Sequence, residues 1–226
     1  MPIILSDLDG TILDIRNRFA HAQVNALTSF DHSVTIDQVL PIMHLAYTMD
    51  YTNFLDGLDI SFSPDELIQY FLRIEEEFYK GWQHSFIIPG TIEALKTVRP
   101  RVDALRLITS RAWVEETRRE VESFGLDQVF DHHVFTRGDL ARKEGVSEVP
   151  LFPFSEHRQR LIKLAIADLD NQEDVWVIGD STDEIQAAQE LNATTVGVLT
   201  GFFTKQDLAP FCTHVIESVA EITTLL

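Results

Sequence analysis

Short apolar runs recur along the chain and predict the strands of a buried sheet. Residues 3–5 form the first run, which is brief, rich in β-branched side chains and bounded by polar residues. The runs that share these properties are 105–109, 133–136, 175–178, 195–199 and a weaker one at 213–216. Helical patterns such as 114–124 and 183–191 lie between most of them. This alternation predicts an α/β fold with a Rossmann-like core, in which helices flank a parallel sheet.

Residues 15–88 interrupt this alternation with a helical pattern that continues almost throughout. Within it, Ser63-Pro64 followed by two acids is typical of a helix start. Pro89-Gly90 marks the return of the strand–helix alternation. We therefore expect a core made of residues 1–14 and 89–226 and an inserted helical domain at 15–88.

A second irregular stretch covers residues 138–155 and contains Pro150 and Pro153. It is long for a structureless segment inside a compact domain, and such segments are usually functional or mobile loops. The sequence therefore predicts a loop of this kind, whose role it does not reveal.

Composition narrows the classes of partner. The chain has 226 residues, of which 45% are hydrophobic, and a formal net charge of −18. Nucleic acids and anionic membranes attract clustered Lys and Arg, so this charge argues against both. Cys212 is the only cysteine, which excludes an intramolecular disulfide and a cysteine-rich zinc site. Without a run of about 18 apolar residues or a secretory signal pattern, we expect a cytoplasmic protein.

Carboxylates follow two of the predicted strands. Asp7 and Asp9 come after the first apolar run, and Asp180 and Asp183 come after the run at 175–178. The carboxyl ends of parallel strands meet at one edge of a sheet, so these acids are expected to converge. Four carboxylates in a small volume are tolerable only with a cation or shared protons. Ligand sets made only of oxygen suit Mg²⁺.

Each of these pieces is common by itself, and their conjunction carries the interpretation. A lone DxD is usually a turn, and Asp183 alone would be an ordinary acid at a helix N-terminus. A third polar strand end accompanies them, because Thr109 follows the apolar residues of LRLIT. Its hydroxyl is placed to hold an oxygen of a bound anion at the same edge.

These residues resemble the motifs of the haloacid dehalogenase-like superfamily of hydrolases. DLDGTILD is similar to its first motif, Thr109 in LITS to its second, and VIGDSTDE with TTVGVLTGF to its fourth. The inserted helices occupy the place of that superfamily's helical C1-type cap domain. The resemblance is to phosphoglycolate-phosphatase-like members. Dehalogenating members lack the acid two residues after the nucleophile, so Asp9 favours phosphoryl transfer.

The resemblance implies a Mg²⁺-dependent phosphatase, a phosphoric monoester hydrolase that acts on a small phosphorylated metabolite. Asp7 would be the nucleophile and form an aspartyl-phosphate, and Asp9 would be the general acid and base. Mg²⁺ would be held by the Asp7 carboxylate, the Asp9 main-chain carbonyl and Asp180, with Asp183 as a further ligand or acceptor. The residues implied to contact phosphate are Thr109, Gly10, Thr11, Ser110, Arg111 and Arg158.

The third motif of the superfamily supplies a Lys or Arg that neutralises nucleophile and phosphate, often in a KPxPD-like loop. No such string is present in this chain. Lys143 in DLARKEG is favoured as the catalytic cation, Arg158 is the main competitor, and Lys163 comes third. All three stay open. The reaction requires a fixed cation near the transferring phosphate, but that cation can come from more than one position in the sequence.

Two other functions stay open beside the phosphatase. A phosphomutase of the β-phosphoglucomutase type would need an acid or base about twelve residues after the nucleophile. That place is Phe19 here, with His21 two residues further on. A catalytically silent binding or regulatory protein of the same fold is the other, against which the intact Asp7, Asp9 and Asp180 argue. The sequence gives neither the physiological substrate nor the choice between a monomer and a homodimer.

Overall fold

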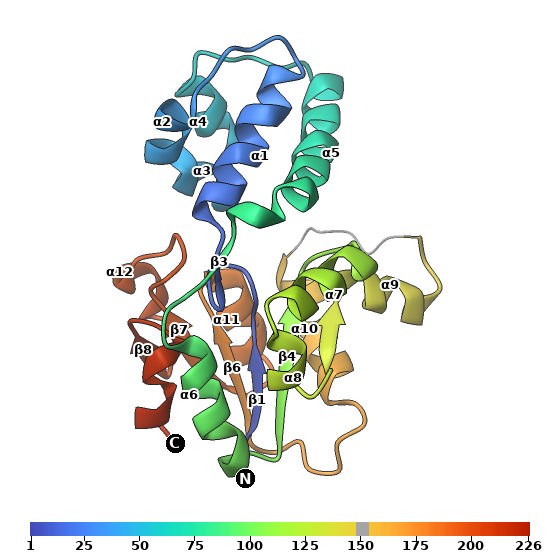
Figure 1. Ribbon diagram of the computed structural model, residues 1–226, viewed down its shortest axis with the longest axis vertical. Helices are drawn as coiled ribbons and strands as arrows, with labels where there is room; N and C mark the ends of the chain where they lie inside the picture. The colour runs from blue at the N-terminus through green and yellow to red at the C-terminus, as the bar shows by residue number, and fades with distance from the viewer. Residues whose placement is uncertain (148–153) are drawn as a thin grey trace. The chain divides into compact units, whose positions relative to one another are not determined.

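A computed structural model describes residues 1–147 and 154–226 of the chain. The chain divides into two compact units (Figure 1): Met1–Leu13 with Ile87–Leu226, called unit 1, and Asp14–Phe86, called unit 2. The chain passes between them through two short strands that pair with each other, β2 (Leu13–Asp14) and β3 (Phe86–Ile87).

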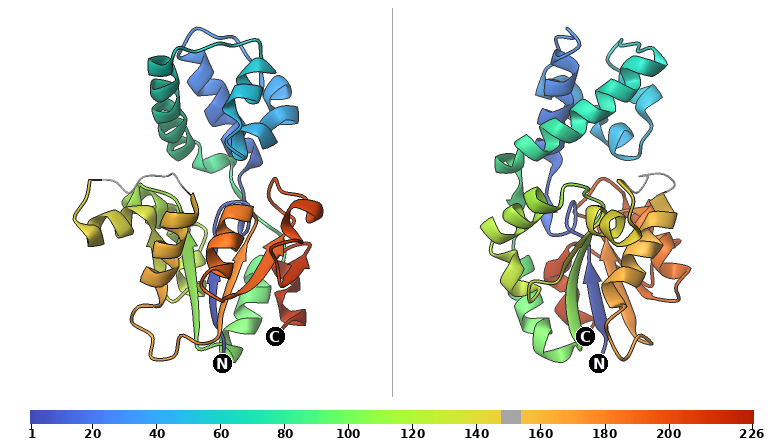
Figure 2. Two further views of the ribbon diagram at one scale, coloured as in Figure 1. Left: turned by 180° about the vertical axis from the view of Figure 1, so that it is seen from behind. Right: turned by 90° about the vertical axis from the view of Figure 1, so that its right-hand side faces the viewer.

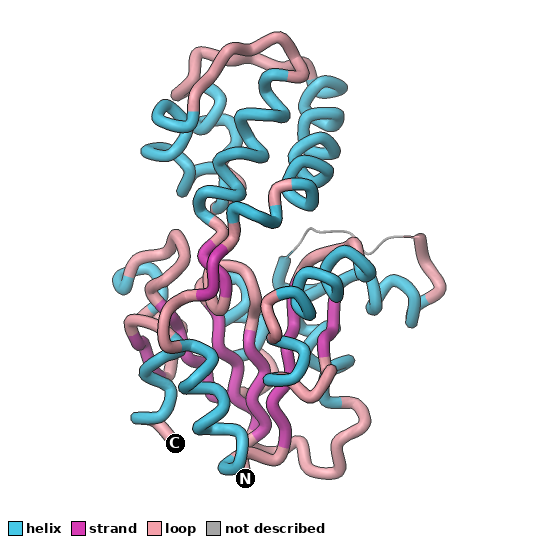
Figure 3. The backbone as a smooth tube through the Cα atoms, in the orientation of Figure 1, coloured by secondary structure: helices cyan, strands magenta, loops and turns pink. Residues whose placement is uncertain are grey.

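Unit 1 is built around one parallel sheet of six strands (Figure 3). Their order is β5-β4-β1-β6-β7-β8, so β1 lies between β4 and β6. The bounds are β1 Ile3–Ser6, β4 Ala104–Thr109, β5 Val134–Thr136, β6 Val175–Gly179, β7 Thr194–Val198 and β8 His214–Ile216. Each predicted run forms one of these strands, which confirms the α/β fold class. The register pairs Ser6 with Leu107 on one side and with Ile178 on the other.

Helices cover both faces of this sheet (Figure 2). One face carries α6 (Thr91–Val98), α7 (Val114–Ser123) and α8 (Leu126–Val129), and the other carries α10 (Phe154–Ile166) and α11 (Thr182–Gln189). On the second face, Ile3 and Leu5 pack with Leu161 and Ala187 in one buried cluster. The remaining elements are α9 (Arg137–Glu144), α12 (Lys205–Leu208), η3 (Arg99–Arg101) and η4 (Val219–Thr224).

The irregular stretch expected at 138–155 begins as a helix instead. α9 starts after Thr136, whose hydroxyl accepts a 3.0 Å hydrogen bond from the Asp139 N–H while the Asp139 carboxylate accepts one from the Thr136 N–H. Gly145 ends it in the left-handed conformation at φ 70°. The capping box at its start and the glycine at its end stabilise this helix. Few of its residues are apolar, so hydrophobic periodicity does not predict it. Residues 148–153, with Pro150 and Pro153, lie outside the described residues.

Unit 2 consists of helices. They are α1 (Arg16–Thr28), α2 (Ile36–Val39), η1 (Leu40–Ile42), α3 (Met43–Tyr47), α4 (Tyr51–Asp56), α5 (Pro64–Lys80) and η2 (Trp82–His84). α5 starts as predicted, because Ser63 caps it and Pro64 takes its first position. In unit 2, the side chain of Arg18 is fully buried against the ring of Phe78 and donates a 2.6 Å hydrogen bond to the Phe78 carbonyl.

No helix in the described ranges is long and apolar enough to cross a membrane.

Candidate active site

The candidate site lies where the three central strands of unit 1 end. Asp7 follows β1, Thr109 is the last residue of β4, and Asp180 follows β6. The Asp7 N–H donates a 2.9 Å hydrogen bond to the Ile178 carbonyl, which ties the first acidic turn to β6. The sheet order reverses at β1, and such a switch point is where open α/β sheets bind ligands.

Two glycines bring the main chain against the Asp180 carboxylate. A Cβ on either Gly10 or Gly201 would overlap the side-chain atoms of Asp180. Gly10 also has φ 77°, a left-handed conformation that glycine adopts without strain. Thr200 donates a 2.5 Å hydrogen bond to the Gly10 carbonyl and holds this turn in place. The turn after β1 therefore requires glycine both for its shape and for its closeness to Asp180.

Arg158 joins two of the buried carboxylates. Its Nη1 donates to Oδ1 of Asp7 at 3.0 Å and to Oε1 of Glu184 at 2.9 Å. The guanidinium comes from α10, Asp7 from the turn after β1, and Glu184 from the first turn of α11. Asp7, Asp180 and Glu184 are 2%, 1% and 0% exposed. Together with Arg158 these three acids make a buried group with two net negative charges when all are ionised.

Burial controls the proton affinity of these acids. Desolvation raises the pKa of Asp7, an effect that Arg158 opposes and that the nearby charge of Asp9 reinforces. Desolvation raises the pKa of Glu184 well above its usual value, with Arg158 opposing and the charges of Asp7 and Asp180 adding to the rise. The pKa of Asp183 is also raised by burial. Such shifts mark a place where negative charge is costly without a cation.

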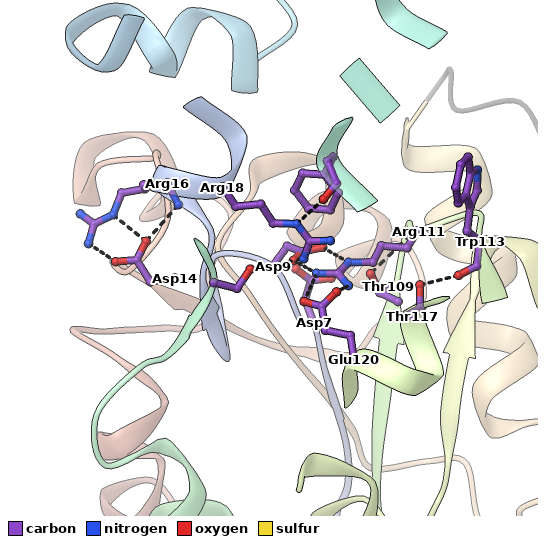
Figure 4. Close-up of polar contacts among 12 residues, drawn as sticks. Asp7, Asp9, Asp14, Arg16, Arg18, Thr109, Arg111, Trp113, Thr117 and Glu120 are labelled. Atoms are coloured by element: carbon purple, nitrogen blue, oxygen red, sulfur yellow. Dashed lines mark hydrogen bonds and ion pairs between the residues drawn. The ribbon is translucent and has the colours of Figure 1, made fainter. Parts of the chain in front are cut away.

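Asp9 is held by a second arginine (Figure 4). Arg111 donates to its two carboxylate oxygens, from Nε at 2.8 Å and from Nη2 at 2.7 Å. Arg111 also donates to both oxygens of Glu120 on α7, at 2.7 and 3.2 Å. Arg111 was expected to contact phosphate, which stays a prediction; in the structure its guanidinium lies between two carboxylates.

The other predicted residues divide between this edge and the surface. Lys143 is exposed near the end of α9, and Lys163 is exposed on α10. The favoured third-motif cation therefore lies on a solvent-facing position, while its competitor Arg158 contacts Asp7, because α10 directs the arginine inward.

Among the described residues, the buried hydroxyl oxygen of Thr11 has no protein hydrogen-bond partner. Ser110 forms a 2.7 Å hydrogen bond with the buried His157.

Two buried acids of this region escaped the sequence analysis, Glu184 and Glu120. Glu184 lies three and four residues before Ala187 and Ala188, so it belongs to the buried stripe of α11. Glu120 likewise lies on the buried face of α7, with Thr117 and Val121. An acid on an apolar stripe needs a partner, and that pattern was the available signal. Asp183 was named instead, because it follows Asp180 closely in the sequence after the strand.

The oxygen donors suit Mg²⁺ in one arrangement and not in another. Across residues 1–147 and 154–226, no three histidine, cysteine, aspartate or glutamate side chains are arranged to hold a metal ion. A set that uses the side chains of Asp7, Asp180 and Asp183 together is therefore not assembled among these residues, and Asp183 as an acceptor beside the metal stays a prediction. The smaller set of Asp7, Asp180 and the Asp9 carbonyl fits, because Mg²⁺ is usually bound by one or two carboxylates with several waters. The close approach of glycine backbone to Asp180 fits a small, enclosed oxygen site.

Solved structures share this fold. A candidate phosphatase from Clostridium difficile is 20% identical, with a TM-score of 0.74 over 100% of this chain and 98% of its own. A candidate β-phosphoglucomutase from Thermotoga maritima is 22% identical (TM-score 0.68, 100% and 98%). A hydrolase from Deinococcus radiodurans, solved with bound phosphate and sodium, is 18% identical (TM-score 0.67, 100% and 94%). At such identities the likeness shows the fold alone.

The family itself is shown by the sequence. No curated protein sequence matches the chain significantly. The family model for haloacid dehalogenase-like hydrolases matches residues 4–198, which include the strand ends, both acidic turns and the inserted helices. The chain therefore belongs to the haloacid dehalogenase-like hydrolase family.

Proposed function

We propose that the protein is a Mg²⁺-dependent phosphatase that hydrolyses a small phosphorylated metabolite through an aspartyl-phosphate on Asp7. The observation that carries this proposal is the pair of buried acids Asp7 and Asp180 at adjacent strand ends, with Arg158 from α10 bound to Asp7. It combines a carboxylate nucleophile, a second carboxylate for a metal and a fixed cation in one place. The candidate phosphatase and the phosphate-bound hydrolase among the structural relatives support the same reaction class.

The reaction has two steps that balance. In the first, an Asp7 oxygen forms a bond to phosphorus while the bond from phosphorus to the ester oxygen breaks. The protonated Asp9 carboxyl gives its proton to that leaving oxygen, which departs as an alcohol. In the second, a water oxygen bonds to phosphorus, Asp9 takes a proton from the water, and the bond from phosphorus to Asp7 breaks. The sum is ester plus water giving alcohol plus inorganic phosphate.

The chain supplies the positive charge and the hydrogen bonds for the phosphate. Arg158 contacts the Asp7 carboxylate and offsets its charge, so an anionic ester can approach the nucleophile. Thr109 and the buried hydroxyl of Thr11 offer further contacts to phosphate oxygens from the ends of β4 and β1. Family members generally depend on Mg²⁺. Held here by Asp7, Asp180 and the Asp9 carbonyl, Mg²⁺ would stabilise the charge that develops on the phosphoryl group.

The mutase alternative gains no support from unit 2. A mutase needs a proton-transfer group at the place of Phe19, and the Phe19 ring packs edge-on against Tyr47 and Phe78. His21, on the same helix, stacks on His84 at 3.9 Å between ring centroids. These aromatic contacts account for both residues as packing elements of the helical unit. We therefore retain hydrolysis, with water as the final acceptor.

The test is hydrolysis of 4-nitrophenyl phosphate by the full chain with and without Mg²⁺, together with the Asp7→Asn variant. We expect turnover that requires Mg²⁺, a phosphoryl group on the Asp7 peptide in acid-quenched enzyme, and loss of both in Asp7→Asn. Asp168→Asn is the matched control, since Asp168 pairs with Arg106 and not with Asp7. Activity retained in Asp7→Asn would overturn the nucleophile, and no turnover on a broad panel of phosphate esters would favour a silent binding protein.

A further inference from the structure

Arg111 uses both edges of its guanidinium on carboxylates. The edge formed by Nε and Nη2 faces Asp9, with distances of 2.8 and 2.7 Å to its two oxygens. The end formed by Nη1 and Nη2 faces Glu120, with distances of 2.7 and 3.2 Å. Figure 4 shows the guanidinium between the two acids. Paired bonds of this kind fix the planes of both partners as well as their separation.

The arrangement is buried and comes from three separate elements. The side chains of Arg111 and Glu120 are each 4% exposed, and that of Asp9 is 17% exposed. Arg111 follows the end of β4, Glu120 lies on α7, and Asp9 lies in the turn after β1. Arg111 and Glu120 stand nine residues apart in the chain, and Asp9 lies 102 residues from Arg111. Glu120 therefore anchors the arginine from the helix, and the arginine reaches the turn.

We propose that Arg111 and Glu120 are positioning residues, which together hold the Asp9 carboxyl group in the orientation required for its proton transfers. This proposal rests on the phosphatase function proposed above. A carboxylate offers about four lone-pair positions, so two bonds from Arg111 orient Asp9 without exhausting its capacity to hold a proton. Glu120 acts indirectly, because it fixes the plane of the Arg111 guanidinium that binds Asp9. Neither residue needs to touch the substrate.

The rival role for Arg111 is that of a phosphate ligand that leaves Asp9 when substrate arrives. The two roles differ in the step that they affect. An arginine that binds phosphate acts on every ester equally, because all esters carry the same phosphoryl group. An arginine that orients a general acid acts most on esters whose leaving group needs a proton. Dependence on the leaving group therefore separates them.

The experiment compares a series of para-substituted phenyl phosphates, from 4-methoxyphenyl to 4-nitrophenyl, which share one shape and differ in leaving-group acidity. The variants are Arg111→Lys and Glu120→Gln, with Asp9→Asn as the reference for a lost general acid. The quantity is kcat/KM, since it reports the step in which the leaving group departs and not the later hydrolysis of the phosphoenzyme, which is common to all esters. Inhibition by inorganic phosphate is measured beside it.

We expect kcat/KM for the least acidic leaving groups to fall by about 10- to 100-fold in both variants, a part of the roughly 100- to 10,000-fold that general acid catalysis supplies, because Asp9 itself remains. For 4-nitrophenyl phosphate we expect a loss of less than about 3-fold, because a good leaving group needs little proton transfer. The plot of log kcat/KM against leaving-group acidity therefore becomes steeper, as in Asp9→Asn. Inhibition by inorganic phosphate stays near the wild-type value.

Arg106→Lys is the matched control for loss of a buried arginine. Arg106 lies on β4, its side chain is also 4% exposed, and it binds Asp168 and the Ala165 carbonyl, away from Asp9. A general weakening of the fold would lower the unfolding midpoints of Arg106→Lys and Arg111→Lys alike and leave the leaving-group slope unchanged. The milder Glu120→Gln keeps the test available if Arg111→Lys fails to fold.

Equal losses of kcat/KM across the series, with weaker inhibition by phosphate, would overturn the proposal and make Arg111 a phosphate ligand. A wild-type slope in both variants would overturn it as well. Failure of the phosphatase function itself has a different signature, because the wild-type protein would then hydrolyse none of the esters.

Discussion

Arg158 places a buried guanidinium nitrogen 3.0 Å from Asp7 and 2.9 Å from Glu184, whereas Lys143 is exposed on α9. We expect Arg158→Ala to lower kcat by about 100- to 1,000-fold, the loss typical of removing one group that stabilises transition-state charge. Lys143→Ala and Lys163→Ala should stay within a factor of about 2, as substitutions of exposed side chains away from the site do. The kcat of each variant is measured with 4-nitrophenyl phosphate. Arg158→Lys is included as a variant that keeps the positive charge.

The outcome that contradicts this assignment is a large loss in Lys143→Ala with activity retained in Arg158→Ala. Thermal unfolding of each variant is the companion measurement, because removing Arg158 leaves two buried carboxylates without their shared partner. A variant with a wild-type midpoint and no activity reports chemistry, not folding.

Cys212 gives a second residue-scale prediction. Burial raises the pKa of its thiol to about 11, although a hydrogen bond from the Gly197 backbone opposes the rise. The reactive form is the thiolate, so at pH 8 the folded protein holds about 100 times less of it than an unfolded chain whose thiol has a pKa of 9.0. The rate of modification by a disulfide reagent should rise by about that factor in urea, and in the folded protein about tenfold per pH unit. Equal rates in folded and unfolded protein would contradict the shift.

At the scale of elements, α9 depends on its cap. The Thr136 hydroxyl accepts from the Asp139 N–H at 3.0 Å, and Thr136 is fully buried. Thr136→Val keeps the shape and removes the acceptor, so we expect a loss of about 1 kcal/mol in the free energy of unfolding. Urea denaturation measures it. The control is Thr97→Val on α6, where the threonine hydroxyl donates back to the Glu93 carbonyl and caps nothing. A loss in the control as large as in Thr136→Val would contradict the role of the cap.

The same helix shows where sequence reasoning succeeded and failed. The strands were predictable because each is a short apolar run between polar residues, as at 3–5 and 175–178. α9 was not, because only Arg137, Leu140 and Ala141 of its eight residues are buried, which leaves no clear apolar stripe. Its capping threonine is also the last residue of β5, as predicted, so the helix follows the strand without a loop. A local hydrogen-bond pattern decided the structure where hydrophobic periodicity carried no signal.

In the candidate site, too, some residues could be predicted from the sequence and others could not. Acids that directly follow strands, such as Asp7 and Asp180, could be placed from the sequence, because parallel strands end at a common edge. The partners of those acids could not. Arg158, Glu120 and Glu184 lie on helices, and their inward direction depends on how each helix is rotated on the sheet. In α11 Glu184 is buried and its neighbour Asp183 is only partly buried, a difference set by the rotation of the helix.

For the molecule as a whole, the arrangement at β1 concentrates negative charge at one point of an already acidic chain. The formal net charge is −18, and three buried carboxylates lie at the switch point of the sheet, of which Asp7 and Glu184 share Arg158. Burying charge without compensation costs free energy of folding. A cation that binds the folded chain at this point should therefore stabilise unit 1 as well as assist the chemistry, and stability becomes a measure of metal binding that does not depend on activity.

The last prediction uses that measure. At a Mg²⁺ concentration of about 100 times the dissociation constant, binding to the folded state alone stabilises by about 2.7 kcal/mol. For a chain of this size that corresponds to a rise of about 5 to 10 °C in the unfolding midpoint. We expect this rise on adding Mg²⁺ to chelator-treated protein, its loss in Asp180→Asn, and its retention in Asp168→Asn. A full rise in Asp180→Asn would show that Mg²⁺ binds elsewhere, even if the protein proves to be a phosphatase.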